Sequence, residues 1–183
     1  MNRKKVAGRV AAWMMAAWVV GLLAAGLMAG CGQADSAKKL SAQEIDGHST
    51  CELDGMLLAD YPGPKAQIFY QGKDSPGFFC DTVEMFHTVL RPEQVRAIQA
   101  VYVQDMGRAN WEQPRGNWIV AADAFYVLGS KRHGSMGPTI ASFALEADAQ
   151  KFMAQWGGKL LRYGQVTPAL VDLSGGALHD SRM

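Results

Sequence analysis

The chain has 183 residues, enough for one or two small domains, and 18 basic against 17 acidic side chains give it a net charge of +1. This balance lacks the basic excess of nucleic-acid-binding domains, so no nucleic-acid partner is expected. The sequence also contains no phosphate-binding glycine loop, dinucleotide fingerprint, paired zinc-ligand spacing or nucleophile–base pair, and we therefore expect a protein that is not an enzyme.

Residues 1–30 are predicted to be a secretory signal. Its basic residues come first: Arg3, Lys4, Lys5 and Arg9. An uncharged apolar run follows over residues 10–28, as in export signals. Small residues then lead into Cys31, as in the lipobox of bacterial lipoproteins, so we expect Cys31 to be lipidated and to begin the mature chain. The alternative is an uncleaved membrane anchor, because the apolar run is almost long enough to span a bilayer.

The residue after the lipidation site bears on localisation. Gly32 stands where aspartate would favour retention in the inner membrane, by resemblance to lipoprotein sorting rules. We therefore expect a protein anchored to the outer membrane, facing the periplasm and touching the membrane only through its lipid. Loss of the signal leaves a mature net charge of about −3. Residues 31–50 are polar with little periodicity and are predicted to be a flexible tether.

Residues 51–110 show the pattern of a first β-β-α-β half. The predicted strands are residues 66–70, 78–80 and 100–104. Residues 72–77 have the glycine and proline content of a hairpin connection between the first two strands. A helix is predicted to begin at Asp81 or Thr82, which are good N-cap residues. Pro92 either ends this helix or opens a second short one.

Residues 111–175 are predicted to repeat this order. The strand-like segments are residues 118–120, 124–128, 139–145 and 160–163. Residues 129–138 have the composition of a long turn, and residues 146–156 predict an amphipathic helix closed by two glycines. Pro168 marks a short C-terminal helix, and residues 176–183 a loose tail. We expect an α+β fold whose two β-β-α-β halves pack together, because each is small for a core of its own.

Cys51 and Met56 are the first candidates for a metal site. They lie five residues apart in a polar segment, and Gly55 directly precedes the methionine. A thiol and a thioether held close by a turn are soft ligands, which favour Cu(I). The alternative for Cys51 is a disulfide with Cys80, because these two cysteines remain in an oxidising compartment once Cys31 carries lipid. The ordinary alternative for Met56 is a place in the core.

Three further residues are candidate ligands. Met136 lies between Gly134-Ser135 and Gly137-Pro138, a poor context for a core residue and a good one for aiming a sulfur at a site. His133 could add a nitrogen ligand, but a solvent-exposed loop histidine is the favoured interpretation. Cys80 directly precedes the predicted helix start, where thiol pKa values fall. It is therefore either a second ligand or a buried, inert thiol.

Several motifs, taken in order, resemble the NosL family of copper-binding accessory lipoproteins of nitrous oxide reductase. The resemblance covers essentially the whole mature domain. The motifs are the lipobox, Cys-x-x-x-Gly-Met from Cys51, Asp-Tyr-Pro-Gly-Pro-Lys over residues 60–65, Phe79-Cys80, Tyr-Val-Gln-Asp-Met-Gly-Arg over residues 102–108, and Ser-Met-Gly over residues 135–137 leading into Ala-Ser-Phe-Ala over residues 141–144.

This resemblance implies a function and a ligand set. Family members bind one Cu(I) per chain and deliver copper for assembly of the catalytic copper–sulfide centre of nitrous oxide reductase, together with an ABC-type maturation complex. Their fold of two β-β-α-β halves is related to organomercurial lyase. Their ligation maps onto Cys51 and Met56, with Met136 as the further sulfur. Many members carry a second cysteine where this chain has Asp54, which keeps Cys51 as the main thiolate.

Two other functions compete with a Cu(I) metallochaperone. One is a structural or docking lipoprotein in which Cys51 and Cys80 form a disulfide and the methionines are core residues. The other is an enzyme similar to organomercurial lyase, which needs Cys51 or Cys80 to face a carboxylate across a pocket.

Overall fold

The computed structural model describes residues 40–173. The predicted signal, the lipidation site Cys31 and the predicted tail over residues 176–183 lie outside these described residues. Within residues 40–173, no helix is long and apolar enough to cross a membrane.

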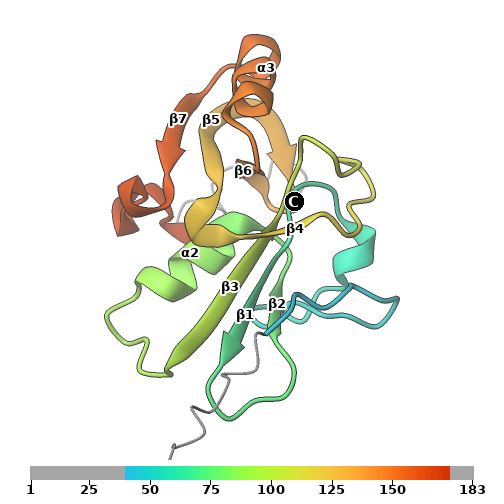
Figure 1. Cartoon of the computed structure of the whole chain (residues 1–183), viewed down its shortest axis with the longest axis vertical. Coiled ribbons are helices and arrows are strands. Elements are labelled where there is room, and N and C mark those ends of the chain that lie inside the picture. Colours follow the sequence, from blue (N-terminus) through green and yellow to red (C-terminus); the bar gives the residue numbers. More distant parts are fainter. Residues whose placement is uncertain (1–39, 174–183) are drawn as a thin grey trace, which may run out of the picture. The chain divides into compact units, whose positions relative to one another are not determined.

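Four antiparallel strands form the first sheet (Figure 1). They are β1 (Ala66–Tyr70), β2 (Gly77–Phe79), β3 (Ile98–Gln104) and β4 (Trp118–Val120). Their spatial order is β2-β1-β3-β4, and all five residues of β1 are buried. Strand β4 was expected in the second half, but its Trp118 pairs with Gln104 of β3 and it completes the first sheet instead. A strand of three residues has too short a sequence pattern to indicate which strand it pairs with.

Helix α2 (Thr82–Leu90) follows β2 directly. Its N-cap is Asp81, whose side chain accepts from the Val83 amide at 2.9 Å, while the Glu84 side chain accepts from the Asp81 amide to complete a capping box. The helix ends before Arg91, which has an extended backbone. The ring of Pro92 disfavours the helical conformation at this preceding residue. Pro92 therefore ends the helix and opens no second one.

Three antiparallel strands form the second sheet, in the order β6-β5-β7. They are β5 (Phe125–Gly134), β6 (Gly137–Phe143) and β7 (Lys159–Arg162), and α3 (Glu146–Trp156) joins the last two. The long turn predicted over residues 129–138 is wrong. Strands β5 and β6 continue through most of it as a hairpin whose tip is Ser135 and Met136. The pairing of β5 with β6 shifts its register after Leu128, close to Gly129. Gly137, at the start of β6, has a positive φ of 98°. The predicted C-terminal helix is a short 3-10 helix, Pro168–Leu170.

The two halves share one hydrophobic core. The ring of Phe86 on α2 lies 5.0 Å from that of Tyr126 on β5 and 5.2 Å from that of Tyr163. Polar contacts join the halves as well, because the Ser142 hydroxyl donates to the Gln104 carbonyl at 2.6 Å. The predicted α+β fold of two packed halves is confirmed.

Residues 40–50 belong to the folded domain and do not form part of a tether. Ile45 is buried beside Cys51, and its carbonyl accepts from Arg115 at 2.8 Å. The Gln43 amide donates to the side-chain oxygen of Gln67, also at 2.8 Å. A single isoleucine among polar residues has no periodicity, so this packing has no recognisable sequence pattern.

The shared core predicts the effect of truncating Phe86. Phe86→Ala should lower the free energy of unfolding by about 3–5 kcal/mol, because it removes a fully buried ring between the two sheets. Val95→Ala is the control, since Val95 is 90% exposed and should change stability by less than about 0.5 kcal/mol. Urea denaturation followed by circular dichroism measures both, and similar small losses in the two variants would contradict the shared core.

Candidate functional site

Cys51 begins a tight turn that ends at Met56. The Cys51 amide donates to the Met56 carbonyl at 2.8 Å, and the Gly55 amide donates back to the Cys51 carbonyl at 2.9 Å. Gly55 has a φ of 79°, which a residue with a side chain rarely adopts. The neighbouring Glu52 amide donates to the Phe78 carbonyl at 2.7 Å, so this turn is fixed against strand β2.

Cys80 lies between strand β2 and the N-cap of α2 and is fully buried. Two donors hold its carbonyl from opposite parts of the chain. The Lys65 ammonium donates to it at 2.9 Å, and the Ser135 hydroxyl at the tip of the β5–β6 hairpin donates at 3.0 Å. The position of this thiol is therefore set by both halves of the molecule.

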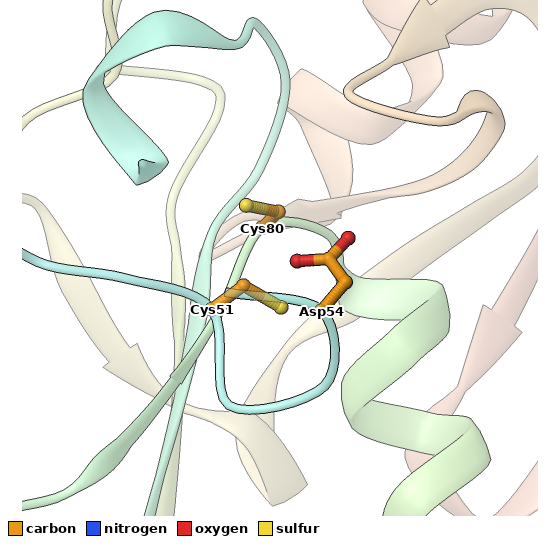
Figure 2. Close-up of side chains that lie close together, drawn as sticks. All are labelled: Cys51, Asp54 and Cys80. Atoms are coloured by element: carbon orange, nitrogen blue, oxygen red, sulfur yellow. The ribbon is translucent and has the colours of Figure 1, made fainter. Parts of the chain in front are cut away.

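The two thiols and one carboxylate converge. One sulfur each from Cys51 and Cys80 and one oxygen from Asp54 all lie within 4.8 Å of one another. Figure 2 shows these side chains meeting between the turn that carries Cys51 and Asp54 and the segment that carries Cys80. Both cysteines are free and buried, whereas Asp54 is exposed. A donor set of two sulfurs and an oxygen, one member open to solvent, can hold a metal ion.

Glu84 adds a second carboxyl group to this site. Its Oε2 atom lies 3.3 Å from the Cys51 sulfur. Burial and the adjacent Cys51 raise the pKa of Glu84 to about 9. A hydrogen bond from the Cys80 thiol lowers the pKa of Cys51 to about 6, and the same bond together with burial raises the pKa of Cys80 well above its usual range. At neutral pH, Cys51 is therefore the thiolate of the group, and Glu84 holds a proton.

Two buried ionisable residues, Lys65 and Asp81, lie next to the site. Lys65 is fully buried, and its ammonium donates to the carbonyls of Pro62 and Cys80 at 2.9 Å each. Burial lowers the pKa of Lys65, while nearby Asp81 and the site's acidic groups oppose that shift. Asp81 accepts from the Thr139 hydroxyl at 2.7 Å, and burial raises its pKa to about 6.

The structure brings one of the two predicted methionine ligands into contact with the thiol cluster. Met56 is half-buried and packs against the cluster that contains Cys51 and Cys80, and its carbonyl lies 3.8 Å from the Cys80 sulfur. Met136 is 52% exposed at the hairpin tip, next to the Ser135 that contacts the Cys80 carbonyl. Met56 therefore borders the thiol pair, whereas Met136 is connected to it only through its neighbour Ser135.

The remaining predicted ligand, His133, is not part of the group formed by Cys51, Asp54 and Cys80. It is an exposed residue of β5, and its carbonyl accepts from the Trp111 ring nitrogen at 3.0 Å. Two neighbours of the thiols were not predicted as site residues. In the sequence, Asp54 stands out only as a departure from the family pattern, and Glu84 does not stand out.

The thiol pair generates a prediction for the metal-free mature chain carrying Cys31→Ser. Titration of ultraviolet thiolate absorbance should show one thiolate forming with a midpoint near pH 6, because the Cys80 thiol stabilises the Cys51 anion. Cys80→Ala removes this donor and should move the midpoint to the ordinary thiol pKa of about 8.5 or higher. Cys51→Ser should abolish the low step. An unchanged midpoint in Cys80→Ala would contradict the hydrogen-bond explanation.

Comparisons with known proteins agree on one family. The model of the NosL family matches residues 42–171. The chain is 38% identical over 158 residues to the copper-binding lipoprotein NosL of Stutzerimonas stutzeri, a match covering 82% of each chain. It is 39% identical over 141 residues to the copper-binding lipoprotein NosL of Achromobacter cycloclastes, covering 75% of this chain and 73% of the relative.

A solved structure is similar as well. The crystal structure of the copper chaperone NosL from Shewanella denitrificans superposes with a TM-score of 0.68 at 40% sequence identity, covering 70% of this chain and 97% of the other. The family model spans nearly all of the described residues, including both halves and both cysteines. On this agreement of sequence and fold, the chain belongs to the NosL family.

Proposed function

We propose that the chain is a Cu(I)-binding metallochaperone that holds one copper ion per chain. The convergence of the Cys51 and Cys80 sulfurs with a carboxylate carries this proposal. Thiolate sulfur is a soft donor that suits Cu(I), and Cys51 is already a thiolate at neutral pH. Relatives that are 38–39% identical are named copper-binding lipoproteins, which supports copper as the cargo.

The donor set fits Cu(I) better than a structural zinc ion. Structural zinc is held by four tetrahedral ligands, mostly cysteine and histidine. The group found among residues 40–173 contains two cysteines and one aspartate, and no histidine. A Cu(I) ion needs only two or three soft ligands, so the two thiols with one thioether would complete its coordination.

We assign Cys51 as the principal ligand and Cys80 as the second thiolate. Met56 is a proposed thioether ligand because it packs against the cluster that contains both cysteines. Met136 is the second proposed thioether ligand, because its neighbour Ser135 donates to the Cys80 carbonyl. His133 is a weaker candidate, since its neighbours place it on β5 outside the thiol group.

Transfer of copper would proceed by ligand exchange without a redox step. Residues 52–55 of the Cys51 turn are exposed, so an incoming donor from a partner would approach the metal from this side. Family membership supports nitrous oxide reductase and its ABC-type maturation complex as the recipients, with the copper used to assemble the catalytic copper–sulfide centre. The chain would work in the periplasm, anchored to the outer membrane through lipidated Cys31.

The enzyme alternative, similar to organomercurial lyase, has a test of its own. It needs a thiol that faces a carboxylate, and the exposed Asp54 carboxylate lies within 4.8 Å of both cysteine sulfurs. Failure of the purified protein to cleave a carbon–mercury bond would dispose of this alternative.

An anaerobic Cu(I) titration against a competing chelator tests the proposal. The mature chain carrying Cys31→Ser should bind one copper ion, and Cys51→Ser should weaken binding by more than about 100-fold, since even loss of a ligand's hydrogen-bond partner costs 10–100-fold. Circular dichroism controls for folding. Equal, weak binding by both proteins would refute the site.

The assignment of Met136 is tested by a matched pair of variants. Met136→Leu should weaken Cu(I) binding by roughly tenfold, or about 1.4 kcal/mol, because leucine keeps the volume and removes the sulfur. Met153→Leu is the control, because Met153 packs on the cluster beneath α3 and should leave copper affinity unchanged. Equal affinities in the two variants would remove Met136 from the ligand set.

A further inference from the structure

The contact between the two thiols permits a second chemistry besides metal binding. Cys51 and Cys80 are free and buried, and their sulfurs lie within 4.8 Å of each other. A disulfide needs a sulfur–sulfur distance of about 2.0 Å, so the two side chains must rotate to bring their sulfurs together. The predicted export signal directs this pair of thiols to an oxidising compartment.

We propose that Cys51 and Cys80 form a reversible disulfide that blocks copper uptake, so that a dithiol reductant must open the site before copper can enter. This inference rests on the proposed copper-binding function. It gives the thiol pair a second class of reactant, namely disulfides and dithiols of proteins or small molecules. Copper transfer does not involve these reactants.

The exchange reaction balances without any other reagent. In the closing direction, the Cys51 thiolate attacks a disulfide and forms a mixed disulfide, and one sulfur of the oxidant leaves as a thiolate. The Cys80 thiol, once deprotonated, attacks the Cys51 sulfur and displaces the second oxidant sulfur. The two protein thiols lose two electrons and two protons. The oxidant takes up these electrons and protons and becomes two thiols. Opening by a dithiol is the reverse reaction.

The surrounding structure indicates that this disulfide is not needed to hold the fold. In the reduced state, the Cys51 turn is already fixed to β2 by the bond between the Glu52 amide and the Phe78 carbonyl at 2.7 Å. On the other side, Lys65 and Ser135 hold the Cys80 carbonyl at 2.9 and 3.0 Å. The backbone on each side of the thiols is thus positioned by other contacts, so the bond can form and break without refolding.

The position of the thiols also makes copper and the disulfide mutually exclusive. Both sulfurs belong to the one group that would hold the metal. A disulfide sulfur carries no thiolate charge, so oxidation removes both strong ligands at once. The turn at residues 52–55 is exposed, and its Leu53 amide donates to the Cys51 sulfur at 3.4 Å, so a reagent would approach Cys51 from the side of this turn.

The test oxidises the metal-free mature chain carrying Cys31→Ser with diamide. The mass should fall by two hydrogens, and peptide mapping should locate a bond between Cys51 and Cys80. Cu(I) affinity measured against a chelator should fall by at least about 100-fold and return in full after treatment with a phosphine reductant. The circular dichroism spectrum should stay unchanged, because the fold does not depend on the bond.

Cys80→Ser is the matched control. It retains Cys51 and cannot form the internal disulfide, so brief diamide treatment followed by removal of any mixed disulfide should leave its own copper affinity unchanged. Asp54→Asn should still form the disulfide, because it alters the third donor without touching the thiols.

Two results would overturn the inference while leaving the copper site intact. One is a quantitative Cys51–Cys80 disulfide that does not weaken copper binding. The other is a folded chain that forms no such bond although the urea-unfolded chain does. A reduced wild-type chain that binds no copper would instead refute the proposed function, and the untreated sample shows this before any oxidant is added.

Discussion

A buried ammonium group organises the centre of the molecule. Lys65 directly precedes β1 and has no exposed surface. Its ammonium group donates hydrogen bonds to the carbonyls of Pro62 and Cys80, and the nearby Asp81 favours its charged form. An unpaired charge in this position would cost several kcal/mol, so the surrounding acidic groups and carbonyls must stay where they are. The cysteine carbonyl, the helix N-cap and the first strand are therefore positioned together.

Three separate segments of the chain contribute to the thiol site. The Cys51 turn supplies a thiolate and an exposed carboxylate, the β2–α2 junction supplies a buried thiol, and a hairpin of the second sheet closes over that junction through Ser135. Two buried thiols and one exposed carboxylate thus converge in a group that could hold a metal ion. Glu84 caps the helix and lies 3.3 Å from the Cys51 sulfur, so it links the electrostatics of the thiol pair to the start of α2.

Sequence patterns predicted the elements with strong local signals. The strand Ala66–Tyr70 and the helix Glu146–Trp156 have the predicted bounds, because an apolar run and a regular amphipathic stripe are both local properties. Strand β4 and the long β5–β6 hairpin were misassigned, since pairing partners and register shifts depend on residues far away in the chain. Cys51, Met56 and Cys80 were identified as site candidates from residue type and spacing. The contacts of Asp54 and Glu84 with the thiols were not, because carboxylates in a turn or in a first helical turn have ordinary local explanations.

The packing of residues 40–50 onto the first sheet limits how far the domain can travel. Only eight residues separate Leu40 from Cys31, and a chain extends by at most about 3.3–3.6 Å per residue, or roughly 30 Å in all. If Cys31 carries the lipid, the domain stays within about its own diameter of the bilayer. Under the proposed function, a recipient of copper would meet the domain at the membrane surface, where the anchor raises the local concentration of the domain.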